Sequence, residues 1–281
     1  FSRIYEAKMA VEQLRNSKEK LKILDVGGYK GNTSQLFPQD NVTVVDQYDV
    51  REDGYVKANA MDLPFMTGEF DVVLSFDVFE HILPHDRIRF LEELVRVSSR
   101  LTIIAAPFST ESNELAETLT NDFYKKIASK DHPWLIEHID NTLPEEHVID
   151  DYLKAKKLKY RVARSNEIVL WTYMQHYILL TGAEGVSIDP REVNRFYNIN
   201  RDSLDIVGDD FYRSVYIIGK KTMPRDEKTK TVGRTTSQIN LASMIFRDIA
   251  DILLEKNKTI SKLNCDLVTL SEEKSVILQE I

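Results

Sequence analysis

The sequence predicts an α/β fold built on a doubly wound, mainly parallel sheet. Four short apolar runs rich in Val, Ile and Leu alternate with amphipathic segments, and such runs are typical of strands buried on both faces of a parallel sheet. Strands that alternate with helices are the pattern of doubly wound domains. A glycine-rich turn directly follows the first run. The four runs are residues 21–26, 42–46, 70–75 and 101–106.

Amphipathic segments around these runs predict the helices. The first is expected over residues 4–19, because Ile4, Ala7, Val11 and Leu14 fall on one helical face. The remaining elements of this domain are predicted as helices over residues 87–97 and 145–157, the second of them preceded by Pro144, and as late strands over residues 160–164 and 212–220.

Two segments break the alternation of strands and helices. Residues 109–141 are polar and partly helical, and they follow the last parallel strand. Residues 166–210 begin with an apolar, aromatic helix at 168–180 and continue as a polar loop region. Loops beyond the carboxyl ends of parallel strands carry the ligand contacts in such folds. We therefore expect both segments to cover a pocket at that edge of the sheet.

The composition changes after residue 220 and divides the chain into three parts. An α/β domain is predicted over residues 1–220, a basic linker over 221–236 and a coiled-coil oligomerisation helix over 237–281. Apolar positions in the last part alternate spacings of three and four, which is the seam of a left-handed coiled coil. We expect a homo-oligomer, with dimer and trimer both open. The seam consists of Ile239, Ala242, Phe246, Ile249, Leu253, Lys256, Ile260, Leu263, Leu267, Leu270, Lys274, Ile277 and Ile281.

Composition excludes some classes of function. The net charge of -8 argues against a nucleic-acid-binding surface, because phosphates require clustered Lys and Arg. Cys265 is the single cysteine, so neither an intrachain disulfide nor a thiolate zinc cluster can form, which fits a reducing compartment. No apolar stretch is long enough to span a bilayer. The chain begins at Phe1 rather than Met and stops inside the heptad pattern, so we expect a fragment of a longer protein.

The glycine-rich turn ILDVGGYKGN suggests a bound ligand, but it does not fit the two common phosphate-binding patterns. A phosphate-cradling loop ends in Gly-Lys-Ser/Thr, but here Asn32 follows the last glycine. A dinucleotide fingerprint starting at Gly27 needs glycines where Tyr29 and Asn32 stand. Glycines still allow a ligand to lie against the backbone. Asp25 at the strand tip favours a ligand that carries positive charge.

This turn resembles the first motif of class I S-adenosylmethionine-dependent methyltransferases. In that motif an acidic residue is followed by three glycines, each separated from the residue before it in the motif by one other residue. Asp25, Gly27 and Gly31 match that motif, and Tyr29 replaces the middle glycine. Further stretches resemble the later motifs in order: VTVVDQYD, KANAMDLPF and FDVVLSFDVFEHI. The resemblance implies a Rossmann-like seven-stranded methyltransferase sheet with helical insertions. It also implies an S-adenosyl-L-methionine site formed by Asp25, Gly27, Gly28, Gly31, Asp46, Gln47, Asn59, Ala60, Met61, Ser75 and Phe76.

Within that implied site, each motif has its own place. Asp46 would bind the ribose hydroxyls, and a carboxylate that accepts two hydroxyl bonds suits the task. Asn59 to Met61 would lie along the adenine, and Ser75 with Phe76 near the methionine end. Taken one at a time, the residues have plainer explanations: two adjacent glycines can form a tight turn, and Asp46 can cap one. Their occurrence together in one sequence supports the expectation that the chain binds S-adenosyl-L-methionine.

Histidines are the natural bases for deprotonating an oxygen acceptor near neutral pH. His81 follows the fourth motif, and HPWLIEH in the first insertion holds two histidines with an aromatic and an acidic residue. We predict His81, His138 and Glu137 as catalytic, and His132 and Trp134 as substrate-binding. The alternatives are that Trp134 and Leu135 staple the loop to the sheet and that His81 is structural. A metal site from His132, Glu137, His138 or Asp140 is a further alternative, but spacing alone does not show convergence, so none is predicted.

Substrate and partners follow from the resemblance alone. Bacterial methyltransferases with a trailing coiled coil are similar to enzymes that modify cell-surface polysaccharides, some of which cap the growing glycan. We therefore expect a glycan or sugar substrate, a cytoplasmic enzyme with a peripheral place at the inner membrane, and membrane-associated glycan assembly proteins as partners. Three alternatives remain open: a small-metabolite methyltransferase, methylation of a terminal phosphate, and a scaffold with a degenerate site that assembles partners through its coiled coil.

Overall fold

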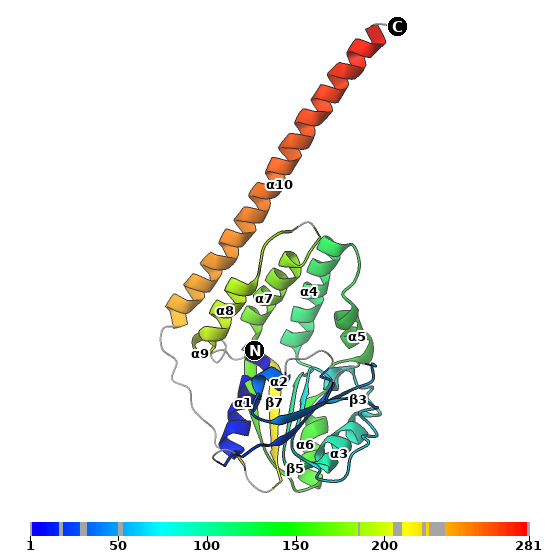
Figure 1. The fold of residues 1–281 in the computed structure, drawn as a ribbon, viewed down its shortest axis with the longest axis vertical. Coiled ribbons are helices and arrows are strands. Elements are labelled where there is room, and N and C mark those ends of the chain that lie inside the picture. Colours follow the sequence, from blue (N-terminus) through cyan, green and yellow to red (C-terminus); the bar gives the residue numbers. More distant parts are fainter. Residues whose placement is uncertain are drawn as a thin grey trace.

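The structure is a computed structural model that describes residues 2–16, 19–28, 33–49, 53–184, 186–204, 210–220, 223–224 and 234–279. A seven-stranded sheet of order β3-β2-β1-β4-β5-β7-β6 forms its centre (Figure 1). Strands β1 to β5 pair in parallel, and β7 runs antiparallel to both of its neighbours. The strands are β1 (Lys22–Val26), β2 (Asn41–Asp46), β3 (Tyr55–Lys57), β4 (Phe70–Phe76), β5 (Ser98–Pro107), β6 (Lys159–Glu167) and β7 (Phe211–Gly219).

These strands confirm the predicted α/β class and its seven-stranded sheet. All four apolar runs form parallel strands, and their fully buried stretches in β4 and β5 explain why they read as continuous apolar sequence. The sequence analysis missed β3. This strand has only three residues and lies at the sheet edge, so it carries no apolar run.

Helices cover both faces of the sheet. On one face α1 (Ser2–Leu14) buries Ala7, Ala10 and Val11. On the other, α3 (Arg87–Val97) and α6 (Glu146–Ala155) pack apolar side chains against the strands. The bounds of α3 match the prediction, whereas α1 ends at Leu14 and not at residue 19. Leu14 is the last buried apolar residue of α1, and polar sequence follows it, so no packing sustains a further turn.

The two insertions form a helical layer beyond the carboxyl ends of the parallel strands, as expected (Figure 1). The first holds α4 (Glu111–Ala128) and α5 (Pro133–Asn141), with Pro133 at the start of α5. The second holds α7 (Ile168–Thr181), α8 (Arg191–Ile199) and α9 (Arg201–Leu204). Helices α4 and α7 pack on each other. A single 3-10 turn, η1 (Phe79–His81), leads out of β4 toward this layer.

Helix α10 (Arg234–Gln279) leaves the domain as a long rod (Figure 1). It begins inside the predicted basic linker, of which residues 221–222 and 225–233 lie outside the described residues. Near its start, Leu241 and Ile252 are buried, and the Tyr177 hydroxyl of α7 donates to the Asp248 carboxylate. Among the described residues, no helix is both long enough and apolar enough to cross a bilayer.

The predicted heptad seam lies on another face of α10. Most of its large apolar members are exposed, with exposed fractions from 55% at Ile260 to 70% at Phe246, whereas Ile249 is partly buried. The helix therefore carries two apolar faces, one packed on its own domain and one largely exposed. The side chains of residues 272–281, which include Lys274, Ile277 and Ile281, are outside the described part. Pairing of the seam with a second helix stays a prediction.

Candidate active site

Strand pairing brings the predicted cofactor residues to one edge of the sheet. Strands β1, β2 and β4 are adjacent and parallel, with Val26 opposite Val45 and Asp25 opposite Leu74. Their carboxyl ends therefore release the glycine turn, Asp46 and Phe76 on the same side of the molecule. This edge is where ligands bind in open α/β sheets.

The glycine turn needs glycine for two separate reasons. Gly27 has φ of +80°, and a Cβ there would overlap the side chain of Val78. A Cβ on Gly28 would overlap the Asp25 carboxylate and lie 3.0 Å from Val44 Cγ1. The Gly27 N–H donates to the Val45 carbonyl at 2.8 Å, which ties the turn to β2. Gly31 lies outside the described residues.

Asp25 lies beneath this turn and not on its surface. Its side chain is buried, and Oδ2 accepts a hydrogen bond of 2.5 Å from the Thr33 hydroxyl at the start of α2 (Thr33–Leu36). The carboxylate thus links the end of β1 to the first turn of the next helix. Its physical role is to hold the loop, and its carboxylate packs directly against Gly28, in the space that a side chain there would need.

Asp46 and Asn59 end the next two segments along the edge. Asp46 is half-buried, and its Oδ1 accepts from the Tyr48 backbone N–H at 3.3 Å. Asn59 is exposed, and its Oδ1 accepts from the Met61 N–H at 3.0 Å, so both side chains brace turns as well as facing the edge. Gln47 is exposed, while Ala60 and Met61 are partly buried against the core.

Ser75 and Phe76 take less open positions than the sequence predicted. Ser75 is 1% exposed, and its hydroxyl has no hydrogen-bond partner within the described part of the chain. Phe76 is partly buried against the core cluster under α1. The next residue, Asp77, has φ of +54°, a strained conformation for a non-glycine residue. Its carboxylate accepts from Arg213 Nε of β7 at 2.5 Å, and this ion pair holds the bend.

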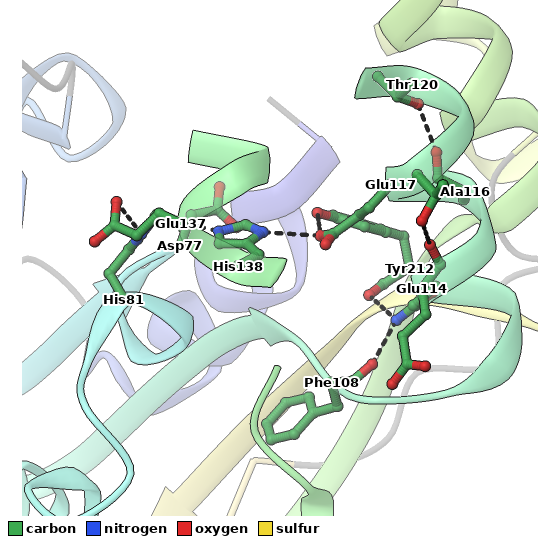
Figure 2. Close-up of polar contacts among 12 residues, drawn as sticks. Asp77, His81, Phe108, Glu114, Ala116, Glu117, Thr120, Glu137, His138 and Tyr212 are labelled. Carbon is green, nitrogen blue, oxygen red and sulfur yellow. Dashed lines mark hydrogen bonds and ion pairs between the residues drawn. The ribbon is translucent and has the colours of Figure 1, made fainter. Parts of the chain in front are cut away.

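The structure brings His81 of η1 and His138 of α5 together. Their Nε2 atoms lie 3.5 Å apart, although the residues are 57 positions apart in the sequence. His138 Nδ1 lies 2.9 Å from Glu117 Oε1 of α4, and both side chains are buried. His81 Nδ1 forms a 3.2 Å ion-pair contact with Glu137 Oε2. In Figure 2, His138 lies between Glu117 and the side on which His81 and Glu137 meet.

These carboxylates determine where the imidazole lone pairs point. Glu117 Oε1 also accepts a 2.6 Å hydrogen bond from the Tyr212 hydroxyl, so it acts as an acceptor from two sides. The proton of His138 therefore sits on Nδ1, and the lone pair on Nε2. His81 Nδ1 lies 3.2 Å from Glu137 Oε2 but forms no hydrogen bond with it. His81 Nε2 lies 3.5 Å from the lone pair of His138, a position that a ring N–H, a proton or a cation can occupy.

Glu80 adds a buried carboxyl group beside this pair. It is 2% exposed, and its Oε2 has no hydrogen-bond partner among the described residues. Burial, and then the charge of Asp77, raise the pKa of Glu80 well above its usual value. Burial, and then the charge of His138, lower the pKa of His81. Glu80 lies in the Glu-His of the fourth motif but was given no role from sequence, and Glu117 and Tyr212 carry no sequence signal.

The other predicted substrate residues lie beside the cluster and not in it. His132 packs edge-on against Tyr124 and Trp134, with ring centroids 4.9 and 5.7 Å away. Trp134 is 67% exposed, so the expected alternative of a tryptophan stapled to the sheet is wrong, whereas its neighbour Leu135 is buried. Asp140 is exposed on the far end of the same helix. The metal set considered from sequence therefore does not converge as a group.

Part of the chain matches a known protein family. Residues 24–104, which run from β1 into β5, match the family described as a methyltransferase domain. No curated protein sequence matches the chain. The fold is similar to the YcgJ protein from Bacillus subtilis, at 14% identity over 79% of this chain and 100% of that chain, with a TM-score of 0.43.

Two further solved structures show the same range of similarity. A possible histamine N-methyltransferase from Thermotoga maritima is 15% identical over 77% of this chain and 89% of that chain, with a TM-score of 0.45. The plantazolicin methyltransferase BpumL, in complex with a pentazolic desmethylPZN analog and SAH, is 13% identical over 78% of this chain and 85% of that chain, with a TM-score of 0.47.

Proposed function

We propose, from the premise that this chain carries a class I S-adenosylmethionine-dependent methyltransferase domain, that it is an O-methyltransferase acting on a cell-surface polysaccharide or its sugar precursor. Capping of a growing glycan is the form of this activity that we favour. One observation carries the proposal of oxygen chemistry. The edge with the glycine turn and Asp46 lies on the same side of the sheet as the paired imidazoles of His81 and His138.

The residues of the donor edge fit the cofactor. When bound, S-adenosylmethionine supplies an electrophilic methyl group on a sulfonium. Gly27 and Gly28 let the turn pack closely on Val78, Asp25 and Val44, and they present backbone without side chains to a ligand at this edge. Asp46 is in position to accept bonds from ribose hydroxyls, and Asp25 beneath the turn favours the positive end of the ligand. Holding donor and acceptor in line contributes several kcal/mol to catalysis.

The histidine pair supplies what an oxygen acceptor needs. A hydroxyl is a weak nucleophile until its proton is removed, and a positioned base contributes roughly 10²–10⁴-fold to the rate. The hydroxyl proton passes to this imidazole pair, in which Glu117 orients His138 through a hydrogen bond and the Glu137 carboxylate lies beside His81. His81 is the more accessible ring, at 27% side-chain exposure against 6% for His138. His81 therefore meets the acceptor, and His138 stabilises the proton once it is taken.

Trp134 supports a sugar as the acceptor. Its ring is 67% exposed at the start of α5, one turn before His138, and it contacts His132. Exposed aromatic rings offer a flat apolar face on which a sugar ring can stack. A small apolar metabolite would gain more from an enclosed pocket than from this open platform.

Helix α10 supports a proposed homo-oligomer. Seam residues such as Ile239, Leu253 and Leu270 are exposed, and the exposed stretch continues beyond Ile252, the last buried residue of the rod among the described side chains. A second copy would cover it by knobs-into-holes packing. Rod and domain share contacts through Leu241 and Asp248, so the oligomer would fix the position of each active site. We place such an assembly in the cytoplasm beside membrane-associated glycan assembly proteins.

A methyl-transfer screen tests the function. Radiolabelled S-adenosylmethionine is supplied with surface glycans, sugar nucleotides and small phenols or carboxylates. Label in the glycan or sugar-nucleotide fractions, made alkali-stable by an ether bond, is the expected result. Label only in the small metabolites would contradict the substrate class. Binding of the donor without transfer to any acceptor would favour the scaffold alternative, for which the exposed seam of α10 is the specific observation.

A further inference from the structure

We propose that Glu80, His81 and His138 form a binding site for one divalent transition-metal ion. The three side chains offer one carboxylate oxygen and two imidazole nitrogens, and these atoms all lie within 4.8 Å of one another. They come from two elements, the η1 turn after β4 and helix α5 of the first insertion. The ion would therefore join the insertion to the sheet edge.

The orientation of the two rings is the first argument. The Nε2 atoms lie 3.5 Å apart, and His138 Nδ1 is hydrogen-bonded to Glu117 behind it, while His81 Nδ1 lies 3.2 Å from Glu137. Metal-bound histidines in proteins have such a carboxylate behind the ring, because it fixes the tautomer and makes the ligating nitrogen more basic. An ion between the rings would replace the hydrogen bond that the two Nε2 atoms otherwise share.

The second, independent argument is Glu80. It is 2% exposed, and its Oε2 is a buried acceptor without a hydrogen-bond partner among the described residues. A buried carboxylate without a partner is costly, and pairing with a metal ion is one of the ways in which proteins offset that cost. The charges of Arg213 and Arg87 act on Glu80, but Arg213 gives its hydrogen bonds to Asp77 and Asn166. Within the described part of the chain, Glu80 Oε2 therefore has no directly bound cation, and an ion would supply one.

The donor set indicates the class of ion. Two imidazoles and one carboxylate without a thiolate suit Zn²⁺, Fe²⁺, Co²⁺ or Ni²⁺ better than Mg²⁺ or Ca²⁺, which prefer oxygen ligands. Three protein ligands leave at least one position open for water or an acceptor oxygen. We take Zn²⁺ as the reference ion, since His₂Glu is an established zinc ligand set.

Binding of the ion does not depend on methyl transfer, but its part in the reaction rests on the proposed function. With the ion in place, the imidazoles serve as ligands and do not take the proton. A hydroxyl coordinated at the open position loses its proton to solvent more readily, because the ion lowers its pKa. The histidine cluster would still activate the acceptor, with the ion and not a free ring as the immediate agent.

Titration of the full chain with Zn²⁺ alone, after chelator treatment, tests the site. Calorimetry should give one tight equivalent, and Co²⁺ should give the intense visible bands of a low-coordinate nitrogen and oxygen site. Glu80→Gln preserves shape and should weaken Zn²⁺ binding at least tenfold, while His138→Ala should abolish it. Glu117→Gln, which does not touch the ion, should weaken it roughly 10–100-fold.

Matched controls use the exposed histidines. His85→Ala and His147→Ala remove imidazoles whose contacts are with exposed carboxylates and should leave binding unchanged. The proposal is overturned when Zn²⁺ fails to bind, or when Glu80→Gln binds as tightly as the unsubstituted protein while thermal melting shows both folded. S-adenosylmethionine affinity, measured in the same samples, distinguishes failure of the metal site from failure of the proposed function. If Zn²⁺ does not bind while S-adenosylmethionine binds normally, the metal site is wrong and the proposed function stands.

Discussion

The donor edge and the acceptor cluster lie on the same side of one sheet, but they are assembled in different ways. The donor edge comes from consecutive strand ends, where each motif is a few residues long and the parallel register places it. The acceptor cluster joins η1 to α5 and is braced from α4 and β7. The first arrangement follows from local sequence. The second depends on how an insertion packs, so it can diverge while the donor edge stays the same.

The largest expected effect is on the donor edge. Asp46→Ala should weaken S-adenosylmethionine binding by roughly 10²–10⁴-fold, because two hydrogen bonds to a charged group, each contributing about 1.5–3 kcal/mol, are lost. Calorimetry on the folded variant measures it. Asp49→Ala, an exposed carboxylate three residues on, is the control and should bind normally. Unchanged affinity in Asp46→Ala would mean that the donor lies elsewhere.

The matching substitution on the acceptor side should separate the two regions. His138→Ala should lower the methyl-transfer rate by roughly 10²–10⁴-fold, since it removes a partner of the acceptor-activating pair, while donor affinity stays within about twofold. His147→Ala, an exposed histidine paired with Glu145, should change neither quantity. An unchanged methyl-transfer rate in His138→Ala would show that the cluster takes no part in the reaction.

Glu117 is a positioning residue whose effect should be intermediate. Glu117→Gln keeps the shape but can present an amide N–H to His138, which disturbs the tautomer. The rate constant for transfer should fall roughly 10–100-fold, with the KM for the acceptor little changed. Glu114→Gln, one turn earlier in α4 and exposed, should be close to neutral. An effect of Glu117→Gln on KM alone would contradict the positioning role.

The donor edge and the acceptor cluster also differ in how far they could be predicted from sequence. The parallel strands and α3 carry periodic apolar patterns, and the donor motifs are contiguous, so both were predictable. The approach of His138 to His81 depends on how α5 packs across 57 residues of separation. Glu117 lies in a polar helix that gives no motif. Helix α10 shows the same limit, because Leu241 and Ile252 lie off the heptad seam, and Leu241 is buried by packing against residues of α7 and α8.

The two faces of α10 offer a paired test of the rod. Leu253 belongs to the seam and is 59% exposed, and Leu254 lies beside it, off the seam, at 57%. Leu253→Glu should shift the protein to a monomer in light scattering, because a charge in the seam destabilises the coiled coil. Leu254→Glu should leave the oligomer intact. Equal behaviour of the two variants, or a monomeric unsubstituted protein, would remove the proposed seam.

The smallest expected effect concerns the face of α10 that packs on its own domain. Burial and the nearby Asp248 raise the pKa of Tyr177, whose hydroxyl donates to that carboxylate. A raised folded-state pKa means that the stabilising contribution is complete below about pH 10, the unfolded value, and is lost as pH rises above it. Melting temperature should therefore fall more steeply above pH 10 in the unsubstituted protein than in Tyr177→Phe. Parallel curves would show that the contact contributes nothing.

The central claim is that donor edge and acceptor cluster serve one reaction. A crystal structure of the full chain with S-adenosylhomocysteine tests it most directly. The account predicts the ribose at Asp46, the backbone of Gly28 against the ligand, and the sulfur directed toward His81 and His138. A ligand bound away from Asp46, or one whose sulfur points away from the two histidines, would contradict it.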